Sequence, residues 1–420
     1  MDKILIHGGR PLSGSIKVSG SKNSSLPILA ATLLTREPCI VHGVPDLSDT
    51  NYMLQILAHL GAQVERASGT VTVTAEKVHS LAPYDVVRKM RASVCVLGPL
   101  LGRCKEATVA LPGGCVIGDR PIDLHLKGFE ALGAAVRVQA GDIKVFAPKL
   151  SGAVINMHGK FGPTVLGTDN IMMAAVLADG VTVIEGAAQE PEVVDLANFL
   201  NQMGGKIEGA GTRRLIIEGV SELHGAEHWV IPDRIEAGTF LVAGAIAGKG
   251  VTVNRVQPEH VRAITDALTR CGFPLVFEDR SISILPNGDA TALELKTEPY
   301  PGFPTDMQAQ MCALLSTSKG TSSVTDNVFP QRYMHVAELK RMGAKVQLEG
   351  ATAVIDGVDR LLAAPVMASD LRASAALVLA GLKADGVTEV SRVYHIDRGY
   401  ERLDEKLGEL GAHVERVKAP

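Results

Sequence analysis

A cysteine between glycines is the residue in this sequence best suited to covalent or acid–base chemistry. Cys115 stands in the phrase LPGGCVIGDRP, with Arg120 five residues further on. The glycines predict an exposed loop, and the guanidinium group of Arg120 would favour a thiolate or hold an anion beside it. The other five cysteines occupy apolar or helical stretches, where cysteine is usually a small buried hydrophobe. None of the six forms a CxxC pair, so neither a disulfide framework nor a zinc site is expected.

A carboxylate and a lysine stand at two predicted helix starts. Asp306 follows Pro304-Thr305 just ahead of a helical pattern, where an acid can cap the helix or act as a general base. Lys22 stands in SGSKNSS ahead of an apolar run, where backbone N–H groups and one cation can bind an anion. A solvated helix start is the simpler interpretation of Lys22 taken alone.

Three arginines in polar phrases could complete an anion site. They are Arg332, Arg372 and Arg398. Each alone would be explained by an ion pair. Together with Lys22 and Arg120 they could enclose a phosphate and a carboxylate, because guanidinium binds both groups through paired hydrogen bonds. The phrases GxxxxGK[ST], GxSxG and HExxH are absent, which removes the P-loop kinase, α/β-hydrolase and zincin interpretations.

A repeated phrase predicts the elements that must position these residues. An amphipathic helix that ends in Gly and is followed by a β-branched run occurs six times, with the glycines at 61, 133, 204, 272, 343 and 411. Gly suits the left-handed residue after a helix, and Val or Ile suits a strand. A second apolar helix is expected in each repeat, as at 171–178, 239–247 and 373–384. The sequence therefore predicts an α/β fold of six modules of roughly 70 residues, three per domain. A continuous six-unit solenoid is the alternative.

Composition excludes several classes of protein. The 420 residues are 46% hydrophobic and 21% charged, with a formal net charge of −4. This argues against disorder and against general nucleic-acid binding, which usually needs a basic face. The apolar run at 373–382 is too short for a membrane span, and no secretory signal is expected. Scattered cysteines favour a reducing cytoplasm.

Several longer phrases resemble one known family. They are SGSKNSSLPILAA, MRASVCVLGPLL, LPGGCVIGDRPIDLH, EPEVVDLANFL, PDRIEAGTFLVA, FPTDMQAQ, RYMHVAEL, DLRASAALVLAG and YHIDRGYERL. The chain is similar, along 19–403, to the UDP-N-acetylglucosamine 1-carboxyvinyltransferases, the enolpyruvyl transferases of the first committed step of peptidoglycan synthesis. The resemblance implies a two-domain inside-out α/β barrel, with helices inside and sheets outside. It implies one domain at 22–231 and another made of 1–21 and 232–420.

The resemblance also implies a reaction and roles for the residues above. Such proteins move the enolpyruvyl group of phosphoenolpyruvate to the 3′-hydroxyl of UDP-N-acetylglucosamine and release phosphate, without a cofactor or a metal. Cys115 would be the proton donor and Asp306 the base. The expected cations for phosphate and carboxylate are Lys22, Arg120, Arg398, Arg332 and Arg372. The partners implied are these two small molecules, with no nucleic acid and no membrane span.

The remaining expected contacts concern the sugar nucleotide. By resemblance they are Asn23, Arg91, Arg120, Pro121, Ile122, Asp123, Leu124 and Val328, with Glu190 and Asp370 as secondary contacts. Lys160 and Thr164 would touch diphosphate or uridine, but the segment 160–170 is two residues longer than the commonest family pattern, so their register stays open. A shikimate-3-phosphate enolpyruvyl transferase is the alternative enzyme, although it lacks the cysteine loop. A noncatalytic scaffold or sugar-nucleotide sensor is the alternative of another class.

Overall fold

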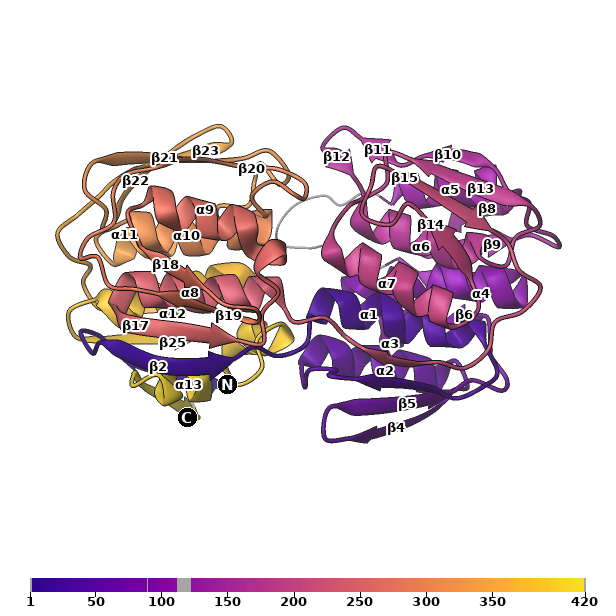
Figure 1. Cartoon of the computed structure of the whole chain (residues 1–420), viewed down its shortest axis with the longest axis horizontal. Helices are drawn as coiled ribbons and strands as arrows, with labels where there is room; N and C mark the ends of the chain where they lie inside the picture. The colour runs from indigo at the N-terminus through magenta and orange to yellow at the C-terminus, as the bar shows by residue number, and fades with distance from the viewer. Residues whose placement is uncertain (1, 89, 112–121, 419–420) are drawn as a thin grey trace. The chain divides into compact units, whose positions relative to one another are not determined.

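The computed structural model of the chain describes residues 2–88, 90–111 and 122–418 (Figure 1). These residues form two compact units. The carboxy unit consists of Met1–Ser19 and Pro232–Pro420, and the amino unit of the described part of 20–231. Cys115, Arg120 and Pro121 lie outside the described residues, as does the side chain of Arg91. Within the described ranges no helix is both long enough and apolar enough to cross a membrane.

Three helices of the amino unit are buried over most of their length, because they are apolar on nearly every face. They are α1 (Lys22–Ala31), α4 (Leu97–Cys104) and α6 (Val165–Ala175). Three others leave more of their surface in solvent: α2 (Ser48–His59), α5 (Asp123–Ala131) and α7 (Pro191–Gln202), of which α7 is the most buried. The unit also has the short helix α3 (Tyr84–Val87) and the 3₁₀ turns η1 (Thr32–Leu34) and η2 (Arg91–Val96).

The carboxy unit repeats this division. Its buried helices are α8 (Arg234–Ala247), α10 (Gln308–Leu315) and α12 (Leu371–Lys383). Its amphipathic helices are α9 (Arg262–Arg270), α11 (Met334–Arg341) and α13 (Leu403–Glu409). Its 3₁₀ turns are η3 (Pro258–Val261), η4 (Thr305–Met307) and η5 (Val393–Arg398). In each unit the ribbon shows the buried helices between the sheets (Figure 1).

The described residues contain six four-stranded sheets with one hydrogen-bonding pattern: a parallel pair followed by two antiparallel pairs. In the amino unit the orders are β16 (Glu227–Trp229), β3 (Cys39–His42), β5 (Thr70–Thr74), β4 (Gln63–Ala67); β6 (Leu81–Ala82), β7 (Glu106–Ala110), β9 (Asp142–Phe146), β8 (Ala135–Gln139); and β10 (Val154–Asn156), β13 (Val181–Glu185), β15 (Arg214–Glu218), β14 (Lys206–Glu208). A small hairpin joins β11 (His158–Gly159) to β12 (Gly162–Pro163).

In the carboxy unit the orders are β2 (Leu12–Lys17), β17 (Gly248–Asn254), β19 (Ser281–Ile284), β18 (Leu275–Phe277); β20 (Glu294–Thr297), β21 (Thr321–Asp326), β23 (Thr352–Asp356), β22 (Lys345–Glu349); and β24 (Pro365–Met367), β25 (Val387–Ser391), β1 (Asp2–His7), β26 (His413–Lys418). Two of these sheets are completed by strands from the start of the chain, β1 and β2. In the amino unit, the late strand β16 completes a sheet by pairing with the early strand β3. Within the described residues the chain therefore passes between the units twice, near Ser19 and near Ile231.

The six glycines of the repeated phrase all have left-handed backbone, with φ between 88° and 100°. Each lies one residue past the cap of an amphipathic helix, as expected for a residue without a Cβ. The predicted starts of the buried helices were wrong by two to six residues. Caps explain the earlier starts: Thr164, Asp233 and Asp370 accept hydrogen bonds from the first backbone N–H groups of α6, α8 and α12.

Gly357 follows β23, and a Cβ at this position would lie 1.6 Å from the carbonyl oxygen of Ser318. We expect Gly357→Ala to lower the free energy of unfolding by about 1–3 kcal/mol, because backbone must move to make room. Gly408 in α13 is the matched control, since a Cβ there meets nothing within 4 Å. Gly408→Ala should be neutral or stabilising by about 0.5–1 kcal/mol. Urea denaturation measures both, and equal effects of the two substitutions would contradict the packing.

Candidate active site

A carboxylate shared by two arginines is the strongest polar cluster of the carboxy unit. Asp306 lies in η4, directly before α10. Its Oδ1 accepts a hydrogen bond of 2.7 Å from Nη1 of Arg332. Its Oδ2 accepts bonds of 2.8 Å from Nη2 and 3.1 Å from Nε of Arg372. Three separate segments, at 306, 332 and 372, therefore meet at one carboxylate, so Arg332 and Arg372 each form an ion pair, which is the interpretation of each arginine taken alone.

Both arginines of the Asp306 cluster are buried. Arg372 is 1% exposed and Arg332 is 6% exposed, while the Asp306 side chain keeps 24% of its surface in solvent. Burial alone would raise the pKa of Asp306, but Arg372 and Arg332 outweigh burial and hold this pKa well below its usual range. Asp306 is therefore ionised at neutral pH, and the cluster carries one net positive charge.

One donor of Arg372 is unused. Its Nη1 atom is buried and has no hydrogen-bond partner among the described residues. Its guanidinium carbon lies 5.2 Å from the centre of the Tyr400 ring, and the Tyr400 hydroxyl is itself held 2.9 Å from Thr239 Oγ1 and 3.1 Å from Gln310 Nε2. Buried donors are almost always satisfied. An unused guanidinium donor beside a net positive cluster suits an anionic ligand.

Asp326 ties Val328 to this cluster, and sequence reasoning missed it. Its Oδ1 accepts bonds from the backbone N–H groups of Val328 (3.0 Å) and Phe329 (2.8 Å). Its Oδ2 accepts a bond of 2.7 Å from Thr305 Oγ1. Thr305 precedes Asp306, so one buried carboxylate fixes both segments. An Asp at the end of a β-branched run, two residues before Val328, is a turn signal that could have revealed it.

The other expected residues of the carboxy unit lie at helix ends. Asp370 caps α12 and accepts a 2.9 Å bond from the backbone N–H of Arg372, which fixes the start of the helix that carries this arginine. Arg398 is the last residue of η5 and is half-buried. The structure thus brings Asp306, Arg332 and Arg372 into direct contact.

In the amino unit, Lys22 is the first residue of α1. Its Nζ lies 3.1 Å from Oδ2 of Asp49 in α2, and Asn23 beside it is half-buried. Ser21 caps this helix and accepts a 3.3 Å bond from the backbone N–H of Ser24. The phrase therefore forms a helix start, as expected, but this start is not solvated, because the Lys22 side chain is only 12% exposed and paired with Asp49.

A second missed carboxylate supports the start of α1. Asp195 in α7 is 3% exposed. It accepts a short hydrogen bond from the Ser24 hydroxyl, and its Oδ1 lies 2.9 Å from Nε2 of His228. It also accepts a 3.2 Å bond from the backbone N–H of Ile231. The pairing spans more than 170 residues along the chain, so local sequence patterns carry no signal for it.

The remaining expected contacts surround helix starts of the amino unit. Ile122 is half-buried ahead of α5, whose first residues are Asp123 and Leu124. Glu190 stands directly before α7. Lys160 is exposed in the turn between β11 and β12, and Thr164 caps α6 by accepting a 3.2 Å bond from the backbone N–H of Gly167. The Thr164 side chain thus has a structural role of its own.

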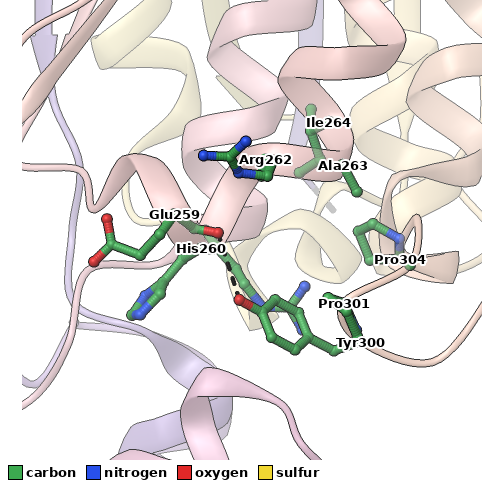
Figure 2. Close-up of a pocket in the computed structure, with 10 residues that line it drawn as sticks. Glu259, His260, Arg262, Ala263, Ile264, Tyr300, Pro301 and Pro304 are labelled. Atoms are coloured by element: carbon green, nitrogen blue, oxygen red, sulfur yellow. Dashed lines mark hydrogen bonds between the residues drawn. The ribbon is translucent and has the colours of Figure 1, made fainter. Parts of the chain in front are cut away.

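A pocket of about 230 Å³ lies beside the segment that leads to Asp306 (Figure 2). Figure 2 shows Tyr300, Pro301 and Pro304 facing Glu259, His260 and Arg262 across the pocket, whose lining also includes Arg234. The Tyr300 hydroxyl donates a 3.4 Å bond to the carbonyl oxygen of Glu259. The guanidinium carbon of Arg234 lies 5.7 Å from the centre of the Tyr300 ring, and Asp306, Arg332 and Arg372 are not among the lining residues.

The fold and this cluster fit one class of protein, and a family comparison identifies it. The family described as EPSP synthase (3-phosphoshikimate 1-carboxyvinyltransferase) matches residues 6–407. The chain therefore belongs to this family.

Individual relatives of the chain carry a more specific name than the family does. A UDP-N-acetylglucosamine 1-carboxyvinyltransferase of Akkermansia muciniphila is 60% identical over 420 residues, with 99% of each chain covered. The protein of the same name from Methylacidiphilum infernorum is 58% identical over 417 residues, again with 99% of each covered.

Solved structures agree on the fold. The enolpyruvyl transferase NikO from Streptomyces tendae has a TM-score of 0.90 at 25% identity, covering 100% of this chain and 99% of its own. EPSP synthase from Acinetobacter baumannii has a TM-score of 0.78 at 16% identity, with full coverage of both chains. At that identity the second likeness concerns the fold alone. The predicted mixed α/β class is confirmed.

His335 in α11 gives a pH-dependent prediction for the cluster's surroundings. It is 1% exposed, its Nε2 has no partner among the described residues, and burial lowers its pKa to about 4 against the pull of Asp370. Between pH 6.5 and 4 the unfolded chain binds this proton and the folded chain does not. The free energy of unfolding should therefore fall by up to about 3 kcal/mol as the pH drops through this window.

Urea denaturation across this pH window tests the role of His335. His335→Asn should flatten that part of the pH dependence. His59→Asn, which removes an exposed histidine at the end of α2, is the matched control and should keep the wild-type profile. Parallel profiles for wild type and His335→Asn would show that His335 is not the titrating group.

Proposed function

We propose that this chain transfers the enolpyruvyl group of phosphoenolpyruvate to the 3′-hydroxyl of UDP-N-acetylglucosamine and releases phosphate, the first committed step of peptidoglycan synthesis. The observation that carries the proposal is the full-length identity of 60% to a relative named for this activity. The family also contains enzymes named for 3-phosphoshikimate. The intact cysteine loop and the Asp306 cluster speak against a noncatalytic scaffold.

The Asp306 cluster supports a specific role for the arginines. Phosphoenolpyruvate carries a phosphate and a carboxylate, and Arg332, Arg372 and Arg398 offer guanidinium groups that bind both. Arg372 already has one unused donor. When an anion takes over further guanidinium bonds, Asp306 loses the partners that hold its pKa low. Its pKa then rises, and the carboxylate becomes a stronger base in the presence of substrate.

The chemical step can be written with these residues. The 3′-oxygen of the sugar bonds to carbon 2 of phosphoenolpyruvate while carbon 3 accepts a proton from Cys115, and Asp306 takes the hydroxyl proton. The product of this addition is a tetrahedral ketal. Loss of phosphate from carbon 2 with a proton from carbon 3 restores the double bond. Lys22 and Arg120 balance the charge of the leaving phosphate.

The finer architecture belongs to the same proposal. The common strand pattern of the six sheets and the six left-handed glycines support six β/α modules, three in a domain at 22–231 and three in a domain of 1–21 and 232–420, arranged as inside-out barrels. The sugar nucleotide would contact Asn23, Arg91, Pro121, Ile122, Asp123, Leu124 and Val328, with Glu190, Asp370, Lys160 and Thr164 further out. Five described cysteines are free, which supports a cytoplasmic compartment.

Acceptor specificity tests the proposed function directly. Purified protein should release phosphate from phosphoenolpyruvate with UDP-N-acetylglucosamine and at a far lower rate with shikimate 3-phosphate. Asp306→Asn should lower kcat with UDP-N-acetylglucosamine by about 10²-fold or more, because general base catalysis typically contributes 10²–10⁴-fold. Turnover with shikimate 3-phosphate that equals or exceeds that with the sugar nucleotide would assign the chain to the alternative enzyme. No release with either acceptor would favour the scaffold.

Cys115 gives a covalent test of the proton donor. A phosphonate epoxide such as fosfomycin resembles phosphoenolpyruvate, and we expect it to alkylate Cys115 and inactivate the enzyme, since the sequence predicts a loop thiol close to Arg120 and such thiols are reactive. Cys115→Asp keeps an acid and should keep transfer while resisting inactivation; Cys115→Ser should lose most turnover. Peptide mass spectrometry locates the adduct. Cys104→Ser, at a half-buried thiol, is the matched control, and an adduct on Cys104 would overturn the role of Cys115.

A further inference from the structure

Two histidines and a glutamate meet on the first and last strands of the chain. His7 of β1 lies opposite His413 of β26 in the antiparallel register. Their rings are stacked, with centroids 3.8 Å apart and planes 8° from parallel. Glu415 follows two residues after His413 on the same face of the strand. Its Oε1 lies 2.6 Å from Nε2 of His413 and 3.9 Å from Nε2 of His7.

The cluster lies on the sheet face turned away from the core. Ile4 and Ile6 of β1 are fully buried, and side chains alternate along a strand, so His7 points to the opposite face. The side chains of His7 and His413 are 34% and 33% exposed, and that of Glu415 is 50% exposed. The charged neighbours on this face are Lys3 and Glu389, which are already paired at 2.6 Å. Solvent and small ions therefore reach the three groups.

We propose that His7, His413 and Glu415 form a surface site for a divalent transition-metal ion, with Zn²⁺ as the preferred occupant. One ligand atom from each residue lies within 4.8 Å of the other two. Ligands at about 2.0–2.2 Å from a zinc ion lie at most roughly 4 Å apart. The stacked rings must turn out of parallel for their nitrogen lone pairs to meet at one ion, while the paired strands hold the backbone in register.

The donor set selects the class of ion. Two imidazoles and one carboxylate suit zinc, nickel or copper, whereas magnesium and calcium prefer oxygen ligands alone. Three protein ligands leave one position of a tetrahedral ion for water. The spacing of residues in the sequence could not indicate this site, because His7 and His413 stand 406 residues apart along the chain.

A second cluster shows which feature carries the inference. His42 of β3 stacks on Trp229 of β16 at 4.3 Å, and its Nε2 lies 2.7 Å from Glu227 Oε1. This arrangement has the same histidine–glutamate contact but an indole where the first cluster has a second imidazole. An indole N–H is a donor only and cannot bind a metal. The second imidazole is therefore what distinguishes a metal site from an ordinary surface hydrogen bond.

A bound ion would link the strands β1 and β26 through their side chains. The strands β1 and β26 lie side by side at the edge of their sheet, and Figure 1 marks both ends of the chain in this part of the carboxy unit. An ion that binds only the folded pairing stabilises it by mass action. The expected consequence is a higher Tm with Zn²⁺, without a change in the transferase reaction proposed above.

Equilibrium dialysis of the full chain against Zn²⁺ tests the site. The wild-type chain should bind one more Zn²⁺ than His7→Ala or His413→Ala, and Glu415→Gln should weaken that binding by about tenfold, as loss of one ligand does. His42→Ala is the matched control and should bind Zn²⁺ like the wild type. Zn²⁺ should raise the Tm of the wild type and of His42→Ala, and should not raise that of His7→Ala or His413→Ala.

Co²⁺ absorbance separates this site from the cysteines. Cobalt held by histidine and glutamate gives weak d–d bands alone, whereas a cysteine ligand adds an intense thiolate charge-transfer band. The proposal is overturned if His7→Ala and His413→Ala, folded as judged by an unchanged metal-free Tm, bind Zn²⁺ as the wild type does. It is also overturned if the extra ion gives a thiolate band.

Discussion

One carboxylate between two buried guanidinium groups organises the carboxy unit. Asp306 accepts three hydrogen bonds from Arg332 and Arg372, and these residues arrive on three segments far apart in the sequence. Removing one partner of a buried ion pair typically costs about 3–5 kcal/mol, because the remaining charge is left without compensation. The starts of α10, α11 and α12 are therefore mutually dependent. The same bonds fix the positions of both guanidinium groups.

Buried carboxylates also fix both passages of the chain between the units. In the carboxy unit, the backbone N–H of Ser19 donates a 3.1 Å bond to Glu236, which also binds Lys406. Burial raises the pKa of Glu236 to about 7, against the effect of Lys406. In the amino unit, Asp195 binds the backbone N–H of Ile231 and the hydroxyl of Ser24. Asp195 of α7 thus links the start of α1, with Lys22, to the segment that ends the amino unit.

The sequence predicted the features that depend on local or repeated patterns. It did not predict contacts between residues that lie far apart along the chain. The helix-ending glycines could be found because a left-handed residue favours Gly at every copy. The buried helices could be found from their apolar runs, but their starts could not, since Asp233 and Asp370 were not recognised as caps. Asp195 and the pairing of His7 with His413 depend on contacts between distant segments. A single sequence carries no signal for such contacts unless a family resemblance supplies it.

The proposed anion site would also explain how an acidic protein can hold anionic substrates. The net charge of −4 would repel them at long range, so attraction must come from local charge in a place where water does not screen it. Arg372 provides this: it is 1% exposed, and folding has already removed its water. Asp306 offsets that cost in the free protein and leaves the cluster one positive charge in excess. Under the proposed function, an arriving phosphate or carboxylate would replace one anion by another, which would require little reorganisation of the arginines and would release Asp306 to accept a proton.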